Sequence, residues 1–197
     1  GIKVVTGTGE LLDLNRGLKK NATGFDFRHL FIGSEGTLGL IVELTLEFTN
    51  PPKDLNVMLM GLKSIENTTE VLALFKERLD LTAFEFFSDM AMKKVIESKK
   101  LRNPFDHIYP FYALVEFENY YGDQLSVASE LFEKCIDSGY AGEGVVSQNK
   151  RQAREFWEFR EGITESIASY KPFKSDVSCR ISQTPAFLGD LYKILNR

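Results

Sequence analysis

Cysteine and histidine are both scarce in this chain of 197 residues, which contains two of each. Cys135 and Cys179 are too few for a disulfide framework, so we expect a reducing compartment and a cytoplasmic protein. The histidines, His29 and His107, do not form a pair, and no cysteine cluster accompanies them, so no metal site is expected within the chain. A lone histidine is more often structural than catalytic, and the catalytic residues are therefore left unknown.

Long apolar runs, strongly basic segments and an initiating methionine are also missing. No apolar run approaches the ~20 residues that cross a bilayer, so no transmembrane segment is expected. A net charge of −4 with mixed signs and no basic stripe argues against nucleic acid as the main partner. The chain starts at Gly1 inside an apparent strand, without a secretory or transit pattern, so we expect a piece of a longer protein.

The first 48 residues are rich in strand patterns. Ile2–Val5 and Leu11–Leu14 flank a glycine-containing turn, which indicates a hairpin. From Gly39 to Phe48 the side chains alternate with a period of two, so we expect one half-buried strand. Its apolar side would consist of Val42, Leu44, Leu46 and Phe48.

The sequence Asn50-Pro51-Pro52 interrupts the chain, because proline lacks a backbone donor and restricts the residue before it. We place a boundary there, between domains of residues 1–50 and 51–197. Beyond it, the expected strands are Leu55–Leu62, Leu81–Phe87, Phe111–Phe117 and Gly144–Val146. The expected helices run from Ser64 to about Leu79, from Ser88 or Asp89 past Val95, from Asp123 to Gly139, from Lys150 to Ser169, and from Pro185 to Leu195. This order predicts an α+β fold, with a ferredoxin-like antiparallel sheet that carries helices on one face.

Three glycines lie close together in Gly33-Ser34-Glu35-Gly36-Thr37-Leu38-Gly39. Glycine permits positive φ and has no side chain to keep a ligand away, so such a loop can bring backbone N–H groups against a phosphate or a flat ring. Most glycine-rich loops are simply turns, and the residues alone leave both interpretations open. Glu35 is the one charged group in the loop, and capping of nearby N–H groups is its alternative role.

In the expected helix of residues 150–169, Trp157, Arg160 and Thr164 share one face, because they are spaced at i, i+3 and i+7. An arginine and a hydroxyl one turn apart can clamp a carboxylate, since guanidinium offers a planar fork of donors and threonine adds another. The alternative is a solvated arginine, an ordinary helix threonine and a buried tryptophan, because most charges on helices are solvated.

Several segments resemble the FAD-linked oxidases related to vanillyl-alcohol oxidase, and above all their branch of D-lactate, glycolate and D-2-hydroxyglutarate dehydrogenases. The segment Gly24–Ile41 resembles the flavin-contacting signature of this family. The segment Phe156–Ile167 resembles the substrate-binding helix of the family's cap domain, and Leu81–Phe87, Pro110–Glu116 and Lys174–Ser178 resemble the same branch. The resemblance implies that residues 1–50 are the C-terminal strip of a FAD-binding domain, and residues 51–197 a truncated FAD-linked oxidase C-terminal (cap) domain.

The resemblance also implies roles for individual residues. The residues that would contact FAD are Gly33, Ser34, Glu35, Gly36, Thr37, Gly39, Ile41 and Asn21. The residues that would hold the carboxylates of the substrate are Arg160, Thr164 and Lys174. The segment Ala168–Phe173 is one residue shorter than the spacing usual in the family, which affects the placement of Lys174 more than that of Arg160. The family's catalytic histidines and metal-binding carboxylate have no counterpart in these residues.

On this resemblance, we expect the parent protein to oxidise a D-2-hydroxy acid to the 2-oxo acid by hydride transfer to the flavin of FAD. The small hydroxy acid would be D-2-hydroxyglutarate-like, or else D-lactate or glycolate, for which a second carboxylate clamp is unnecessary. Electrons would leave to a separate acceptor, because no nicotinamide fingerprint is present. A non-catalytic interaction or assembly module is the alternative from another class, and a homo-oligomer is left open. This chain alone is expected to retain no FAD and to be inactive.

Overall fold

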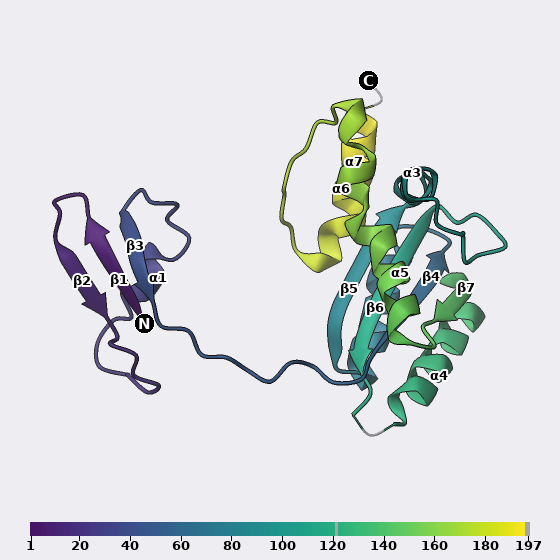
Figure 1. Cartoon of the computed structure of the whole chain (residues 1–197). Helices are drawn as coiled ribbons and strands as arrows, with labels where there is room; N and C mark the ends of the chain where they lie inside the picture. Colours follow the sequence, from purple (N-terminus) through teal and green to yellow (C-terminus); the bar gives the residue numbers. More distant parts are fainter. Residues whose placement is uncertain (121, 196–197) are drawn as a thin grey trace. The chain divides into compact units, whose positions relative to one another are not determined.

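The computed structural model describes residues 1–120 and 122–195, and the chain divides into two compact units, Gly1–Pro51 and Pro52–Arg197 (Figure 1). The first unit contains a three-stranded antiparallel sheet in the order β2-β1-β3. Its elements are β1 (Ile2–Thr6), β2 (Leu11–Leu14), the short helix α1 (Arg28–Phe31) and β3 (Gly39–Leu44). The predicted hairpin of β1 and β2 is confirmed. The buried core of this unit consists of Ile2, Val4 and Phe31.

Strand β3 departs from the regular alternation that the sequence predicts. Val4 lies opposite Ile41 and Lys3 lies opposite Glu43, so Val42 is an extra residue on β3. Such a bulge reverses which side chains point inward on its two sides. The expected buried side is therefore wrong, and the strand ends at Leu44 and not at Phe48. The side chains that we expected to be half-buried are all exposed: Val42, Leu44, Leu46 and Phe48.

The second unit contains a four-stranded sheet in which every neighbouring pair is antiparallel. Its strands are β4 (Leu55–Leu62), β5 (Leu81–Ser88), β6 (Phe111–Glu118) and β7 (Ala141–Val146). Their order is β5-β6-β4-β7, which is the ferredoxin-like order, so the predicted fold class is confirmed. The strands β4 and β6, which have the longest apolar runs, are central, as expected for strands with neighbours on both sides and helices above and below.

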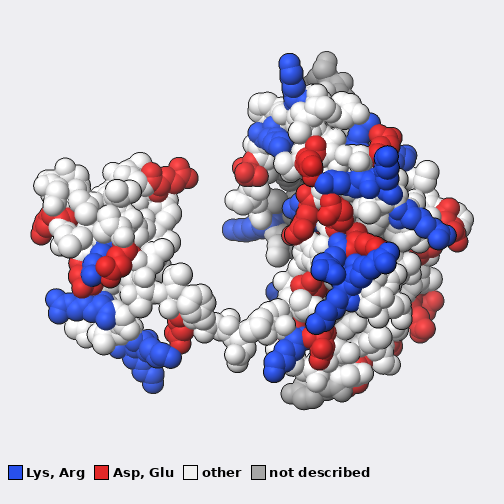
Figure 2. Space-filling view, viewed as in Figure 1, with Lys and Arg blue, Asp and Glu red and all other residues white. Residues whose placement is uncertain are grey.

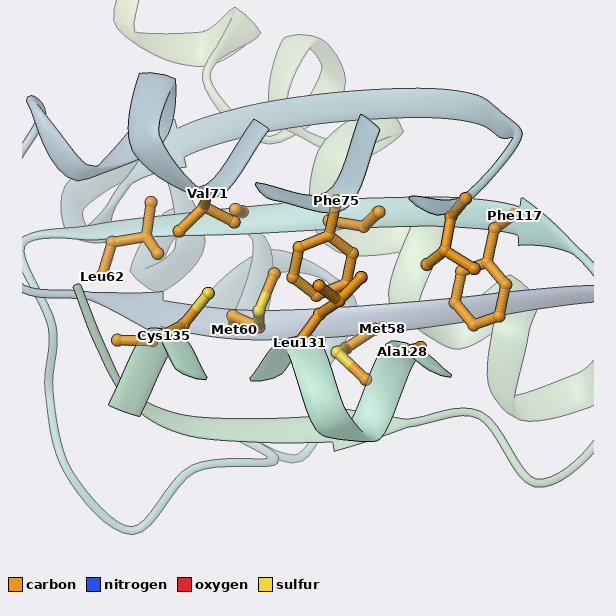
Figure 3. Close-up of a cluster of buried hydrophobic side chains, with 13 residues drawn as sticks. Met58, Met60, Leu62, Val71, Phe75, Phe117, Ala128, Leu131 and Cys135 are labelled. Carbon is orange, nitrogen blue, oxygen red and sulfur yellow. The ribbon is translucent and has the colours of Figure 1, made fainter. Parts of the chain in front are cut away.

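One face of this sheet is covered by α2 (Asn67–Arg78) and α4 (Gln124–Asp137). Figure 3 shows side chains from β4, α2 and α4 meeting in a single buried cluster. Cys135 of α4 lies in this cluster. Burial raises the pKa of its thiol to about 11, so the thiol stays protonated at neutral pH and is a poor nucleophile.

The opposite face of the sheet is covered by α3 (Asp89–Lys99) and α5 (Lys150–Glu161). Val57 and Leu59 of β4 pack on this side, whereas Met58 between them packs toward α2 and α4. The expectation that helices lie on one face only is therefore wrong. The physical reason is that β4 is apolar at successive positions, so both of its sides must be covered.

The starts of the helices agree with the sequence in part. Ser88 caps α3, because its hydroxyl accepts a hydrogen bond from the backbone N–H of Ala91 at 3.3 Å. Helix α2 begins at Asn67, three residues later than expected, and the Ser64 hydroxyl donates to the side-chain oxygen of Asn67 at 3.2 Å instead.

The expected single helix of residues 150–169 is broken after α5. A short helix α6 (Ile163–Ser166) and a 3-10 turn η1 (Ala168–Tyr170) follow. An added Cβ at Gly162 would lie 3.3 Å from Cγ1 of Val95 on α3, so glycine lets the chain pass close to α3. Glycine is also less favourable than alanine inside a helix by about 1 kcal/mol, which is consistent with the break.

The second unit ends in η2 (Ile181–Gln183) and α7 (Thr184–Leu195), and the predicted helix from Pro185 is confirmed. No residue of α7 is buried. Lys and Arg side chains intermingle with Asp and Glu over the visible face of this unit (Figure 2). Among residues 1–120 and 122–195, no helix is both long enough and apolar enough to cross a membrane.

Candidate functional site

The glycine loop of the first unit connects α1 to β3 through a tight turn. Gly33 and Gly36 have φ values of +85° and +79°, and Glu35 between them has a φ of +51°. The backbone N–H of Thr37 donates to the carbonyl oxygen of Ser34 at 3.0 Å, which closes the turn around Glu35 and Gly36. Positive φ favours glycine at positions 33 and 36 whether or not a ligand binds.

The three glycines of the loop have different surroundings. An added Cβ at Gly39 would lie 2.7 Å from Cγ1 of Val4 and 2.9 Å from the carbonyl oxygen of Val5, so this glycine is needed for the packing of β3 on β1. At Gly33 and Gly36, an added Cβ would have no atom within 4 Å. The backbone at these two positions is therefore open to close approach from outside, as contact with a phosphate or a flat ring requires.

The two hydroxyl groups of the loop donate hydrogen bonds to nearby backbone carbonyls, whereas the carboxylate of Glu35 does not take part in the turn. The hydroxyl of Ser34 donates to the carbonyl oxygen of Phe31 at 2.8 Å, and that of Thr37 donates to the carbonyl oxygen of Ser34 at 2.7 Å. Both hydroxyls thus stabilise the turn. Glu35 is exposed, and no hydrogen bond or ion pair joins its carboxylate to any other residue in the part of the chain that the structure describes.

The other two expected flavin residues lie away from the tip of the loop. Ile41 packs on the core of the first unit. The Asn21 amide donates to the side-chain oxygen of Asn15 at 2.8 Å, and Asn21 lines two shallow hollows of this unit. No residue from 33 to 39 lines either hollow. Asn21 instead shares one hollow with Arg28 and the other with Asp26.

Asp26 and Arg28, close to the glycine loop, form a bidentate ion pair. Nε of Arg28 donates to Oδ1 of Asp26 at 2.8 Å, and a terminal nitrogen donates to Oδ2 at 2.6 Å. The hydrogen bonds from Arg28 hold the pKa of Asp26 at about 2. The guanidinium group of Arg28 is therefore already paired with Asp26. Nε2 of the exposed His29 lies 3.5 Å from the same carboxylate.

In the second unit, α5 presents Trp157 and Arg160 to two carboxylates of the sheet. Nε1 of Trp157 donates to Oε2 of Glu116 at 2.7 Å, and Nε of Arg160 donates to Oε2 of Glu85 at 2.7 Å. The hydroxyl of Thr82 donates to the other oxygen of Glu116 at 2.7 Å. The arginine is neither free in solvent nor fully buried, because 40% of its side chain is exposed.

The three expected substrate residues are not brought together by contacts within the unit. Arg160 lies at the end of α5, whereas Thr164 lies in α6 beyond the break at Gly162 and is exposed. Lys174 is exposed in the irregular segment of residues 171–180. In the described part of the chain, no hydrogen bond or ion pair is made by Thr164 or Lys174 to another side chain, so both are available to a ligand.

The sequence model of the family "FAD linked oxidases, C-terminal domain" matches residues 51–197. The chain belongs to this family. A D-2-hydroxyglutarate dehydrogenase of Xanthomonas citri pv. viticola is 49% identical over 196 residues, which are 100% of this chain and 41% of that protein. One from Stutzerimonas stutzeri is 44% identical over 195 residues, 99% of this chain and 42% of the relative. The chain thus spans about two fifths of the length of these relatives.

The structure also resembles a solved member of the same class of fold. A crystal structure of p-cresol methylhydroxylase with substrate bound matches 83% of this chain and 36% of its own, with a TM-score of 0.56 and 10% sequence identity. At this identity the likeness concerns the fold alone.

Two residues that contact this face of α5 in the FAD-linked oxidase domain, Glu85 and Glu116, were not expected from the sequence. Each is the single charge within an apolar run, Ala83–Phe87 and Phe111–Phe117. A carboxylate in such a strand needs a partner, because burial of an unpaired charge is unfavourable. That signal could have identified both residues, although not the side chains of α5 that pair with them.

Proposed function

We propose that the protein to which this chain belongs oxidises a D-2-hydroxy acid of the 2-hydroxyglutarate type to the corresponding 2-oxo acid, with FAD as cofactor. The observation that carries the proposal is the 49% identity, along the whole chain, to a protein named D-2-hydroxyglutarate dehydrogenase. Because the chain spans 41% of that relative, the activity is proposed for the longer protein and not for this chain alone.

FAD, when bound, would accept a hydride from the α-carbon of the substrate. In the first unit, the open backbone at Gly33 and Gly36 fits contact with this cofactor, because an added Cβ at either position has no atom within 4 Å. We assign the same role to the rest of the expected set: Ser34, Glu35, Thr37, Gly39, Ile41 and Asn21. Residues 1–50 would then be a strip of a FAD-binding domain, and residues 51–197 the substrate domain.

Arg160, Thr164 and Lys174 would hold the carboxylates of the substrate. Arg160 has terminal nitrogens beyond the Nε that Glu85 occupies, so it can still offer two parallel donors to a carboxylate. Thr164 adds a hydroxyl and Lys174 a second positive charge. Oxidation of an alcohol also needs a group that accepts the hydroxyl proton, and we assign that role to no residue of this chain.

D-lactate and glycolate are the alternative substrates, since they need one carboxylate clamp and not two. A separate electron acceptor and a cytoplasmic location complete the proposal. The scarcity of cysteine supports a reducing compartment.

The experiment is steady-state kinetics of Arg160→Ala in a full-length, flavin-loaded protein that carries this chain. Loss of a charge-assisted, bidentate contact should lower kcat/KM for D-2-hydroxyglutarate by roughly two to three decades, or ~2–4 kcal/mol. Arg160→Lys should recover part of the loss, because an ammonium group cannot reproduce the planar fork.

The matched control is Arg78→Ala, which removes an arginine that pairs with Glu130 at 2.8 Å on α4. D-lactate, assayed in parallel, separates the two carboxylates of the substrate. If only D-2-hydroxyglutarate turnover falls, Arg160 holds the distal carboxylate; if both fall, it holds the carboxylate that the two acids share. Activity within about threefold of wild type on every hydroxy acid, a difference below 1.4 kcal/mol, would refute the role.

A further inference from the structure

Glu85 is a carboxylate in the middle of the apolar strand β5, between Phe84 and Phe86. In the register of the sheet it lies opposite Leu114 of β6, which belongs to the cluster covered by α3 and α5. Directly opposite residues of an antiparallel pair point to the same face. The carboxylate of Glu85 is therefore directed toward α5, where only a compensating partner makes its partial burial tolerable.

Its partner is Arg160, and the contact uses one particular atom of the guanidinium group. Nε of Arg160 donates to Oε2 of Glu85 at 2.7 Å, and 35% of the Glu85 side chain is exposed. Guanidinium carries five N–H donors, of which Nε supplies one. Among residues 1–120 and 122–195, Glu85 is the one acidic side chain in ion-pair contact with Arg160. The terminal nitrogens are therefore left for a second carboxylate.

Attachment of α5 to the sheet does not depend on this ion pair. Phe156 and Phe159 of α5 are buried in the cluster on this face. Trp157 adds a hydrogen bond to Glu116 at 2.7 Å. The helix is therefore fixed by residues that precede Arg160 in the sequence, and Glu85 acts on the arginine side chain itself.

A carboxylate beside an anion-binding arginine affects the affinity for the anion in two opposing ways. It lowers the net attraction for an incoming anion, because the pair is neutral overall. It also orders a long side chain that would otherwise lose rotamer freedom when the ligand binds. With Nε held, the plane of the guanidinium group is fixed, and its two terminal amino groups lie side by side as the two oxygens of a carboxylate require.

We propose that Glu85 is a positioning residue, which holds Arg160 through Nε so that the terminal nitrogens are presented to a carboxylate of the substrate. The inference rests on the proposed function, in which Arg160 binds that carboxylate. Glu85 would act on Arg160 in the way that residues hydrogen-bonded to the ligands of a metal ion orient those ligands.

The first test observes Arg160 directly in the full-length, flavin-loaded protein that carries this chain. In a ¹⁵N spectrum of the arginine side chains, the Nε–H of Arg160 should give a resolved signal that Arg160→Lys removes. Glu85→Ala should broaden or shift this signal, whereas Glu130→Gln should leave it unchanged. The control is matched, because Glu130 also pairs with an arginine, Arg78, at 2.8 Å but on α4. An unchanged signal in Glu85→Ala would refute the inference.

The second test measures kinetics in the full-length, flavin-loaded protein with D-2-hydroxyglutarate. Glu85→Ala should raise KM roughly tenfold or more with a smaller change in kcat, because the carboxylate is bound in both the ground and transition states. Glu85→Gln should fall between wild type and alanine, since its amide oxygen still accepts from Nε. Glu130→Gln should change KM by less than about twofold.

The double variant Glu85→Ala/Arg160→Ala decides whether Glu85 acts through Arg160. The double variant should be no worse than Arg160→Ala alone, because the arginine to be positioned is already absent. Additive losses would overturn the inference, and so would a lower KM in Glu85→Gln, which would mean that Glu85 only competes with the substrate. If Arg160→Ala itself has no effect, the proposed function fails; if it has an effect and the Glu85 variants do not, only this inference fails.

Discussion

Gly36 is the position in the glycine loop where a conformational role and a ligand-binding role can be separated. Its φ of +79° strains any other residue, so loss of flavin from Gly36→Val alone would be ambiguous. Gly9, in the turn between β1 and β2, provides a match, because its φ is +82° and an added Cβ there also meets no atom within 4 Å. Both valine variants should be destabilised similarly, by about 1–3 kcal/mol.

If the loop contacts FAD, Gly36→Val should lower the ratio of flavin to protein after purification of the full-length protein, whereas Gly9→Val should keep it. Absorbance at the flavin band against total protein measures this ratio. Equal flavin content in the two variants would assign Gly36 to the turn alone.

His107 provides a pH-dependent contact in the second unit. Its Nδ1 meets a carboxylate oxygen of Glu143 on β7, and the same carboxylate accepts the backbone N–H of Asp106 at 2.9 Å. The hydrogen bond and negative charge of Glu143 raise the pKa of His107 above its ordinary value of 6.5. A raised folded-state pKa contributes stability that is fully present below 6.5 and is lost as the pH rises through the folded-state value.

We therefore expect the NMR titration midpoint of His107 to lie above 6.5 in the wild type and to return toward 6.5 in Glu143→Gln. The free energy of unfolding, measured with denaturant, should fall more steeply above pH 6.5 in the wild type than in Glu143→Gln. Identical midpoints in the two proteins would show that the contact does not persist in solution.

Single residues were predictable where the local backbone conformation or the helical spacing alone indicates one residue type. The glycines at positive φ and the arginine on a helix face were both identified from sequence. Glu85 and Glu116 were not, because their partners depend on how β5, β6 and α5 are brought together. Thr164 was placed on the face of Arg160 by helical spacing, and the structure has the two residues in α6 and α5, with Gly162 between these helices.

At the scale of elements, β4 and β7 each have a glycine where the aromatic ring of Tyr109 packs against the strand. An added Cβ at Gly61 on β4 or at Gly142 on β7 would overlap the ring of Tyr109. Gly61→Ala should therefore destabilise the second unit by roughly 1–3 kcal/mol, because the ring must move within a packed environment.

Gly189 on α7 is the control for this substitution, because an added Cβ there meets no atom within 4 Å. Gly189→Ala should be neutral or stabilising by up to about 1 kcal/mol, the difference in helix propensity. Urea unfolding monitored by circular dichroism compares the two variants. If Gly61→Ala is as harmless as Gly189→Ala, Tyr109 does not hold this position in solution.

Elements were easier to predict than their faces. The strands of the second unit were located to within a few residues, because their apolar runs are long and bounded by turn residues. The side on which each helix packs depends on which strand positions are apolar, and β4 and β6 are apolar on both. The bulge at Val42 left no mark in the pattern of alternating residues, because an inserted residue looks like any other.

At the scale of the whole chain, the first unit carries apolar side chains that the described residues do not cover. Val5 lies opposite Leu11 on one side and Leu40 on the other, which places the three on one face of the sheet. Leu11 and Leu40 are 59% and 66% exposed. Exposed apolar strand surface of this kind favours association.

We expect the chain of residues 1–197 to self-associate at micromolar concentration and to remain colourless after incubation with FAD. Leu40→Lys should shift its sedimentation toward the monomer. Thr8→Lys, which adds the same charge at the exposed turn of the same sheet, should not. A monodisperse monomer in the wild type would contradict the expectation, and so would tight flavin binding.

The covering of the second sheet on both faces has a consequence for hydrogen exchange. Leu59 and Leu114 lie opposite each other on the two central strands, and both are fully buried. Their amides can meet solvent only when the helices on both sides and the neighbouring strands have separated. Their exchange should therefore report the free energy of global unfolding, whereas amides at the outer edge of β5 should exchange through smaller, local openings.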